Sequence, residues 1–124
     1  MNTLELDRQL NEMIIAGKSV DGLKTFYAEN VVAQENDEPE RRGRDSWIAA
    51  REQMEKITNK FKARVLAQAV SGDVSFSEWE YEVDLEGMTC SKGRKVFSML
   101  VALGLILAAW RVSSLSRRSL SAFR

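Results

Sequence analysis

The sequence contains no histidine, and this limits the chemistry that its side chains can perform. Without an imidazole there is no Ser-His or Cys-His nucleophilic pair, no zinc site of the usual kind and no histidine switch near neutral pH. The chain also lacks a glycine-rich phosphate-binding loop, so we expect neither a metal nor another cofactor. Any acid–base chemistry must therefore rest on carboxylates, lysine, tyrosine or water.

Two carboxylates separated by a single residue lie in a strand-like segment. Glu78 and Glu80 would share one face of an extended strand with Phe76, because alternate residues point the same way. If that face lines a pocket, each carboxylate raises the pKa of the other. The alternative, which we favour, is an exposed polar face that alternates with Trp79 and Tyr81.

Trp47 and Met54 keep helical spacing along a second segment. They are candidates for the wall of a small-molecule pocket, although helical spacing favours a place in the core. In the same segment Arg51 and Glu55 are four residues apart, and this spacing predicts a supportive pair on the helix surface.

The elements that must position these residues begin with three helices. Apolar residues recur at steps of three and four over residues 4–16, which predicts an amphipathic helix closed by Gly17. A second, short helix begins at Ser19 or Asp21 and frays near Asn30. Asp45 is a good N-cap for the third helix, which should end close to residue 59.

Strands follow from a change in period. Residues 31–34 form a brief strand, and the polar residues 35–43, which contain the only proline, form an exposed loop. Residues 63–71 and 74–85 predict an antiparallel hairpin around Gly72 and Asp73, with a bulge near Ser77. Three helices followed by a meander define an α+β domain whose helices cover one side of a curved antiparallel sheet.

Length and composition indicate a single globular domain in a reducing compartment. The chain has 124 residues, of which 44% are apolar and 29% are charged. Its one cysteine, Cys90, excludes an internal disulfide, so a cytoplasmic location is the simplest expectation. The basic residues of the tail are sparse and lack interleaved aromatic residues, so we expect no nucleic-acid partner.

The charge is divided unevenly along the chain. Residues 1–90 contain all 18 acidic residues, whereas residues 91–124 contain 7 basic residues and no acidic one. The most apolar part of this tail, residues 96–110, would span roughly 22 Å as a helix at about 1.5 Å per residue, short of a hydrocarbon layer of about 30 Å. Membrane association through this segment is therefore an alternative that we do not favour.

The segments LNEMIIAGKSVDGL, FYAENVVAQENDEPERRGRDSWIA and SGDVSFSEWEYEVDL, in this order, resemble the nuclear-transport-factor-2-like superfamily, and especially its small SnoaL-like members. The likeness covers roughly residues 4–87. It implies a cone-shaped roll in which three N-terminal helices and the concave face of the sheet enclose a small-molecule cavity. It also implies a homodimer, because dimers are common in this superfamily.

The resemblance suggests one catalytic residue. Glu35 stands where the ketosteroid-isomerase branch carries its general-base carboxylate, with Asp37 and Glu38 as close competitors. A solvated loop acid is the favoured alternative. That branch also supplies a tyrosine donor from its first helix, near Leu10 here, and Tyr27 would replace it only if its hydroxyl points inward.

The resemblance ends after residue 90, so we divide the chain into a SnoaL-like core, residues 1–90, and an atypical ending, residues 91–124. A shifted reading frame or divergent splice is one explanation for its Ser/Arg/Leu bias. Residues 96–101 and 105–112 can instead pair as substitute strands around Gly104, or the segment can form a hydrophobic helix. A continuous apolar run does not separate these two structures.

The resulting prediction is a pocket domain for a small apolar or carbonyl-containing molecule. If it is an enzyme, a carboxylate would carry out proton transfer or hydration. The alternatives are a noncatalytic module for ligand binding or dimerisation, and a membrane-associated variant with a frame-altered C-terminus.

Overall fold

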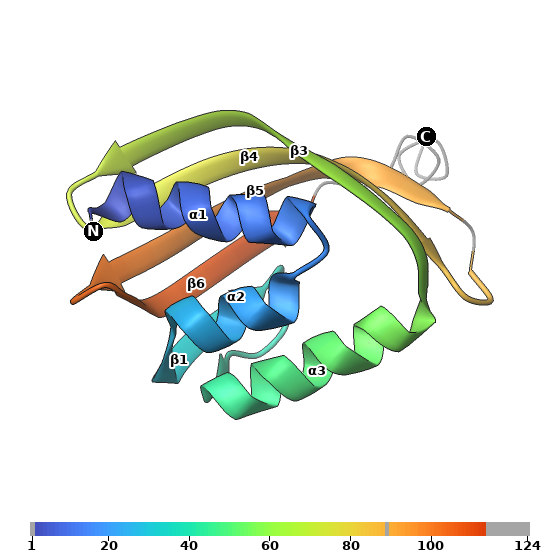
Figure 1. Ribbon diagram of the computed structural model, residues 1–124, viewed down its shortest axis with the longest axis horizontal. Coiled ribbons are helices and arrows are strands. Elements are labelled where there is room, and N and C mark those ends of the chain that lie inside the picture. Colours follow the sequence, from blue (N-terminus) through green and yellow to red (C-terminus); the bar gives the residue numbers. More distant parts are fainter. Residues whose placement is uncertain (1, 89, 114–124) are drawn as a thin grey trace.

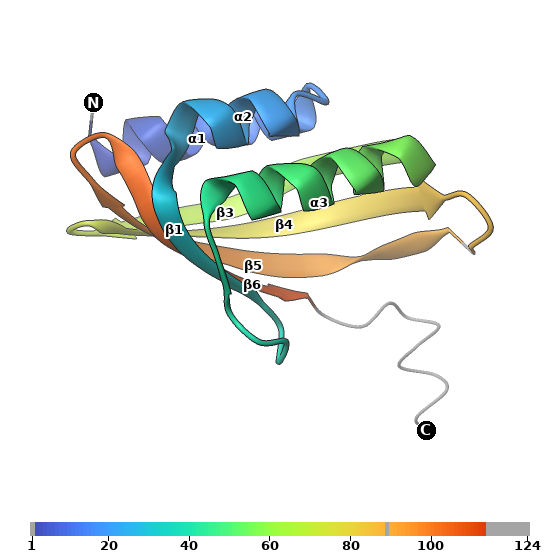
Figure 2. The same ribbon diagram turned by 90° about the horizontal axis from the view of Figure 1, so that it is seen from below.

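Three helices lie on one side of a curved, six-stranded sheet in the computed structural model, which describes residues 2–88 and 90–113 (Figures 1 and 2). The sheet order is β2-β1-β6-β5-β4-β3. The elements in chain order are α1 Thr3–Ile15, α2 Ser19–Phe26, β1 Tyr27–Glu35, β2 Arg41–Arg42, α3 Arg44–Ile57, β3 Thr58–Ser71, β4 Val74–Leu85, β5 Ser91–Ala102 and β6 Leu105–Ser113. The predicted α+β class and the helix-covered curved sheet are confirmed.

The first helix follows its sequence pattern closely. The side chain of Asn2 caps α1 by accepting a 2.8 Å hydrogen bond from the backbone N–H of Glu5. Leu6 and Leu10, one turn apart, are fully buried beneath it. Gly17 ends the helix with a φ of +79°, a left-handed conformation that glycine adopts without steric cost.

Several predicted boundaries need correction. The second helix ends at Phe26 rather than near Asn30, because the backbone is already extended at Tyr27. The first strand is therefore Tyr27–Glu35, longer than the predicted residues 31–34. The third helix is capped by Gly43, so Asp45 lies in its first turn and is not the cap.

The sheet is antiparallel except at one junction. β3, β4, β5 and β6 form a continuous antiparallel meander, whereas β1 runs parallel to β6. Parallel neighbours need a long crossover, and here residues 36–104 separate the two strands. The antiparallel sheet expected from the sequence is thus confirmed, with one parallel junction.

The predicted bulge near Ser77 is absent. β4 pairs with β5 without interruption from Val74 to Val83, and the irregularity lies in β3, between Val65 and Ala67. Alternation therefore continues along β4, so that Ser75, Ser77 and Trp79 are buried on the face that the helices cover.

The segment beyond residue 90 contributes two strands to the centre of the sheet. β5 and β6 form a hairpin whose turn places Leu103 and Gly104 at φ values of +54° and +75°. Residues 96–110 thus lie mainly within these strands. Within residues 2–88 and 90–113 no helix is long and apolar enough to cross a membrane.

The core joins the first two helices to these central strands. Leu6, Leu10 and Phe26 pack in one cluster with Met99 and Ile106, and the cluster continues through Leu23, Tyr27, Val31, Ala33, Val101 and Ala109. No residue of α3 is fully buried. The helix that carries Trp47 and Met54 is therefore peripheral, with Trp47 packed against the edge of the core and Met54 44% exposed.

We predict that a chain ending at Gly87 does not fold. It lacks β5 and β6, so β1 loses its partner in the centre of the sheet, and the buried helix faces lose Met99, Val101 and Ile106. Circular dichroism during urea titration should show no cooperative transition, whereas the full chain should show one. A cooperative transition of the shortened chain would contradict a structural role for these strands.

A second prediction concerns the buried carboxyl group of Asp7. Its Oδ2 accepts a 2.7 Å hydrogen bond from Gln68, but its Oδ1 is buried without a partner among the described residues. Burial raises the pKa of Asp7 above its ordinary value of 3.8, and the hydrogen bond from Gln68 only partly opposes this. The folded state therefore holds its proton to higher pH than the unfolded chain does.

It follows that the contribution of Asp7 to the free energy of unfolding falls as the pH rises from about 3.8 through the raised pKa. Asp7→Asn removes this titration and keeps an oxygen that can accept from Gln68. Urea denaturation at pH 4 to 7 should show the variant gaining stability relative to the original chain as pH rises. Asp37→Asn, at an exposed loop position, is the matched control; equal pH profiles for all three proteins would refute the role of Asp7.

Candidate functional site

A cavity of about 500 Å³ lies between the helices and the concave face of the sheet. Its walls are mainly apolar and aromatic, and they come from all three helices and from β1, β3, β4, β5 and β6. Its apolar and aromatic lining residues are Leu10, Ile14, Leu23, Tyr27, Met54, Phe61, Trp79, Tyr81, Val83, Leu85 and Phe97. A cavity of this size and composition is suited to a small, mostly apolar molecule.

Strand alternation explains which side chains reach the cavity. On β4 the odd-numbered residues from Trp79 to Leu85 face the helices, and on β5 Lys95 and Phe97 do the same. Trp79 is almost completely buried, and its indole N–H donates a 3.0 Å hydrogen bond to the hydroxyl of Ser77. The aromatic part of the wall is thereby fixed in place.

Charged groups gather at one end of the cavity. Arg51 from α3, Lys95 from β5 and Arg111 from β6 all line it. Arg111 forms an ion pair with Glu35, its register partner at the end of β1, and its Nε is buried without a hydrogen-bond partner among the described residues. The cluster therefore contains three cationic side chains and one acid that is already paired.

Burial and mutual repulsion affect the protonation of this cluster. Burial, with Arg111 and Arg51 nearby, lowers the pKa of Lys95 to about 7, and the negative charge of Glu35 only partly opposes this. Burial, and then repulsion from Arg111, also lowers the pKa of Arg51, although a guanidinium group stays protonated in proteins. Burial raises the pKa of Tyr27 to about 12, so its phenol is neutral and able to donate a hydrogen bond at neutral pH.

A second, smaller hollow of about 270 Å³ adjoins the charged end. Arg51, Met54 and Arg111 line both hollows, while Glu35 and Trp47 line only the smaller one. The indole N–H of Trp47 donates a 3.0 Å hydrogen bond to the backbone carbonyl of Arg41, whose guanidinium lies 4.9 Å from the indole centroid. Glu35 thus lines the smaller hollow, and its partner Arg111 lines both the smaller hollow and the main cavity.

The structure brings together some of the predicted site residues. Tyr27 and Met54 line the main cavity, and Glu35, Trp47 and Met54 line the adjoining hollow. Glu35 is the last residue of β1 rather than part of a free loop, and its side chain is 29% exposed. These four residues therefore line two neighbouring hollows that share Met54.

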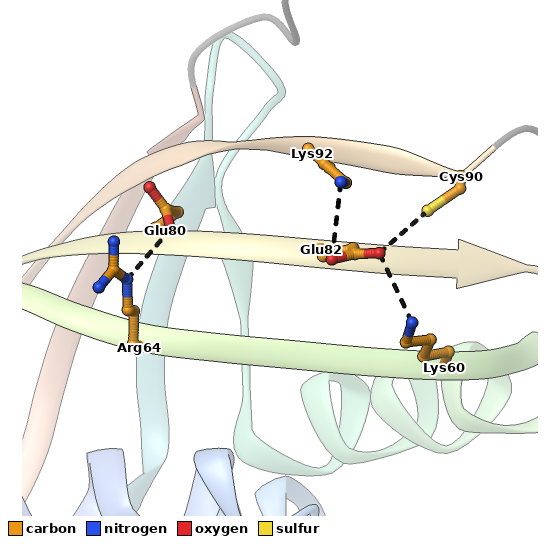
Figure 3. A network of polar contacts seen from close by, with 6 residues as sticks. All are labelled: Lys60, Arg64, Glu80, Glu82, Cys90 and Lys92. Atoms are coloured by element: carbon orange, nitrogen blue, oxygen red, sulfur yellow. Dashed lines mark hydrogen bonds and ion pairs between the residues drawn. The ribbon is translucent and has the colours of Figure 1, made fainter.

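Phe76, Glu78 and Glu80 lie on the other face of the sheet. Without a bulge at Ser77, the even-numbered residues of β4 point away from the helices. Glu80 pairs with Arg64 at 3.1 Å and Glu78 with Arg94 at 3.6 Å, and Phe76 is 42% exposed. Both glutamates belong to a ladder of cross-strand ion pairs along the outer face, of which Figure 3 shows the pairs of Glu80 and Glu82. An exposed polar face is the alternative that the sequence favoured.

Three cavity residues were missed from the sequence. Arg51 was expected in a surface pair with Glu55, whereas the structure turns it into the cavity. Lys95 and Arg111 lie directly beside the apolar stretch of residues 96–110, and the sequence analysis did not select them as site residues. Their inward direction follows from strand parity, which a run with no clear period did not reveal.

The site brings together a carboxylate, guanidinium groups, an amine and a phenol. No group of three acidic or cysteine side chains in residues 2–88 and 90–113 is arranged to hold a metal ion.

Comparison with solved structures identifies the fold. The structure matches a protein of unknown function with a cystatin-like fold from Xanthomonas campestris, with a TM-score of 0.81 and 18% identity over 96% of this chain and 95% of that one. It also matches a protein described as a SnoaL-like polyketide cyclase from Jannaschia sp. CCS1, with a TM-score of 0.80 and 11% identity over 98% and 88% of the two chains.

A third match is an epoxide hydrolase from M. tuberculosis, with a TM-score of 0.77 and 14% identity over 98% of this chain and 96% of that one. No family model matches the sequence, and no curated protein matches it either. The structural matches are distant in sequence but extend over nearly the whole chain. The resemblance expected from the sequence is thereby confirmed at the level of architecture: the chain has the cone-shaped fold of the SnoaL-like, nuclear-transport-factor-2-like proteins.

Proposed function

We propose that the protein binds a small, mainly apolar molecule that carries a carbonyl or carboxylate oxygen. The observation that carries this proposal is the combination of an apolar cavity of about 500 Å³ with Arg51 and Arg111 at one end. The buried Nε–H of Arg111 lacks an acceptor, and a ligand oxygen would supply one. The apolar walls would hold the rest of the molecule away from water.

The reaction that best suits this arrangement is proton transfer next to a carbonyl group. Glu35 is the acid closest to the cluster, and its carboxylate would accept a proton from the carbon beside the carbonyl. The electrons of that C–H bond would move to the carbonyl oxygen, giving an enolate. Arg51 and Arg111 would stabilise this developing negative charge, and the neutral phenol of Tyr27 is a further possible donor.

The fold itself supports this chemistry only in broad terms. Structures with the same architecture include one described as a polyketide cyclase and one described as an epoxide hydrolase. One fold accommodates many reactions, so the choice must come from the residues of the site. A module that binds the same ligand without turning it over is the alternative, and it would use the cavity and the two arginines but not Glu35.

We predict that Glu35→Gln lowers the rate of proton exchange on a bound ketone. The probe is 2-tetralone in deuterium oxide, and the measurement is the loss of its α-proton signals by nuclear magnetic resonance. Removing a general base should slow protein-catalysed exchange roughly 10²- to 10⁴-fold, while the affinity for the ketone, measured by saturation-transfer difference, stays similar.

Asp37→Asn is the matched control, since Asp37 is an exposed acid in the turn two residues beyond Glu35. It should leave exchange unchanged. If Glu35→Gln exchanges the α-protons as fast as the original chain, Glu35 is not the base. Binding of the ketone without protein-catalysed exchange would favour the noncatalytic module.

We also propose a homodimer formed through the outer face of the sheet. Phe76, Val96, Trp110 and Val112 are between 41% and 60% exposed there. Pairing brings them together, because Ser98 lies between Phe76 and Trp110, and Val96 lies opposite Val112. A contiguous apolar patch on a sheet face is typical of a protein–protein contact.

The dimer predicts a simple change in mass. Light scattering during gel filtration should give twice the chain mass of 14.0 kDa for the original protein and the monomer mass for Trp110→Arg. Leu103→Arg is the control, because Leu103 is a fully exposed apolar residue in a turn, and this variant should remain dimeric. A monomeric original chain would contradict the proposal.

Two further proposals come from the sequence rather than from the site. A cytoplasmic location is supported by the single cysteine, Cys90, which is free and exposed. The division of the chain at residue 90, with a frame-altered origin for the ending, is supported by the change in composition at that point. Examining the two other reading frames of the nucleotide sequence for a family-like strand pair would test that origin.

A further inference from the structure

The amine of Lys95 lies in the wall of the main cavity, where its surroundings do not favour the charged form. Lys95 belongs to the inward-facing residues of β5, where it lies opposite Trp79 of β4 and Ser113 of β6. Its Nζ is 5.2 Å from the ring centroid of Trp79 and 5.9 Å from that of Tyr81. The nitrogen is thus held over two aromatic side chains of the cavity wall.

Lys95 differs from the lysines on the outer face of the sheet. Lys60 and Lys92 both pair with Glu82, as Figure 3 shows, and their side chains are 51% and 74% exposed. Lys95 forms no ion pair among the described residues. The charged groups around it are Arg51 from α3, Arg111 from β6 and Glu35 from β1, and the side chains of Tyr27 and Tyr81 line the same cavity.

These surroundings determine the state of the amine. The faces of the two aromatic rings favour an ammonium ion, but burial and the two arginines act against it. The outcome is a pKa of about 7. At pH 7 about half of the Lys95 side chains would be neutral, against roughly one in 10³ for a lysine with the ordinary pKa of about 10.4. A neutral amine next to an apolar cavity is a nucleophile.

We propose that Lys95 forms a covalent imine with an aldehyde or ketone bound in the main cavity. The nitrogen lone pair attacks the carbonyl carbon, the π electrons of the carbonyl move to its oxygen, and one proton passes from the nitrogen to that oxygen to give a carbinolamine. The hydroxyl group then takes up a second proton and leaves as water, while the nitrogen lone pair forms the carbon–nitrogen double bond and the nitrogen gives up its second proton. Amine and carbonyl compound thus yield imine and one water, and no oxidant or reductant is needed.

This inference goes beyond the proposed proton transfer and does not depend on it. The imine forms at Lys95, whereas the proton transfer needs Glu35, so either can fail alone. The cavity must only admit a carbonyl compound, and its volume of about 500 Å³ is sufficient for a molecule of ten to fifteen heavy atoms.

The test uses 1-phenylbutane-1,3-dione, a diketone whose imine rearranges to a stable conjugated enaminone that absorbs in the near ultraviolet. The full chain is incubated with a small excess of the diketone at pH 6 to 9. The absorption band and the intact mass, which increases by one diketone less one water, report the reaction. Peptide mapping identifies the modified lysine in the original protein, so the result does not depend on whether a variant folds.

We expect one modification per chain, at Lys95, with a rate that rises with pH to half its maximum near pH 7. Lys95→Arg keeps a positive charge and should abolish the band, whereas Lys92→Arg, which alters an exposed lysine, should leave it unchanged. Glu35→Gln should still be modified, which distinguishes this proposal from the proton transfer. No modification, modification spread over the exposed lysines, or a rate that still rises tenfold per pH unit up to pH 9 would overturn the proposal.

Discussion

The parallel pairing of β1 with β6 is the contact on which the rest of the structure depends. It joins the first segment after α2 to the last strand of the meander, so the helical part of the chain and the long hairpins become one sheet. The same pairing sets Glu35 opposite Arg111 and thereby creates the charged end of the cavity. In a different register of β1 and β6, Glu35 and Arg111 would not lie opposite each other, because register decides which side chains meet.

Because alternate residues of a strand point to opposite faces, the sheet has a cavity-lining face and an outer face with ion pairs. Along β4, Trp79, Tyr81 and Val83 face the helices, while Glu78, Glu80 and Glu82 face outward and pair with basic residues of β3 and β5. The outer pairs are exposed and contribute little to stability individually. On the inner face, β5 and β6 place Lys95 and Arg111 in the wall of the main cavity. Electrostatic interactions and hydrogen bonds with a ligand are stronger there than on the solvated outer face.

Much of the fold followed from local patterns, but the site did not. The period of Leu6 and Leu10 predicted α1, and Gly72 with Asp73 predicted the β3–β4 turn. Alternation placed Phe76, Glu78 and Glu80 on one face of a strand but did not decide which face the helices cover. The bulge predicted near Ser77 is absent, since register shifts are decided by the partner strand. Lys95 and Arg111 lie in strands whose sequence is a continuous apolar run without alternation. The reason is that β6 has apolar residues on both faces, with Ile106 in the core and Trp110 on the outer face.

The peripheral packing of α3 affects the size of ligand that the cavity can accept. Separating this helix from the sheet would uncover far less apolar surface than separating α1, since α1 contributes Leu6 and Leu10 to the core and α3 contributes no fully buried residue. The wall that carries Arg51 and Met54 is accordingly held by less buried apolar surface than the wall formed by α1. A ligand larger than the cavity would therefore displace α3 more readily than α1.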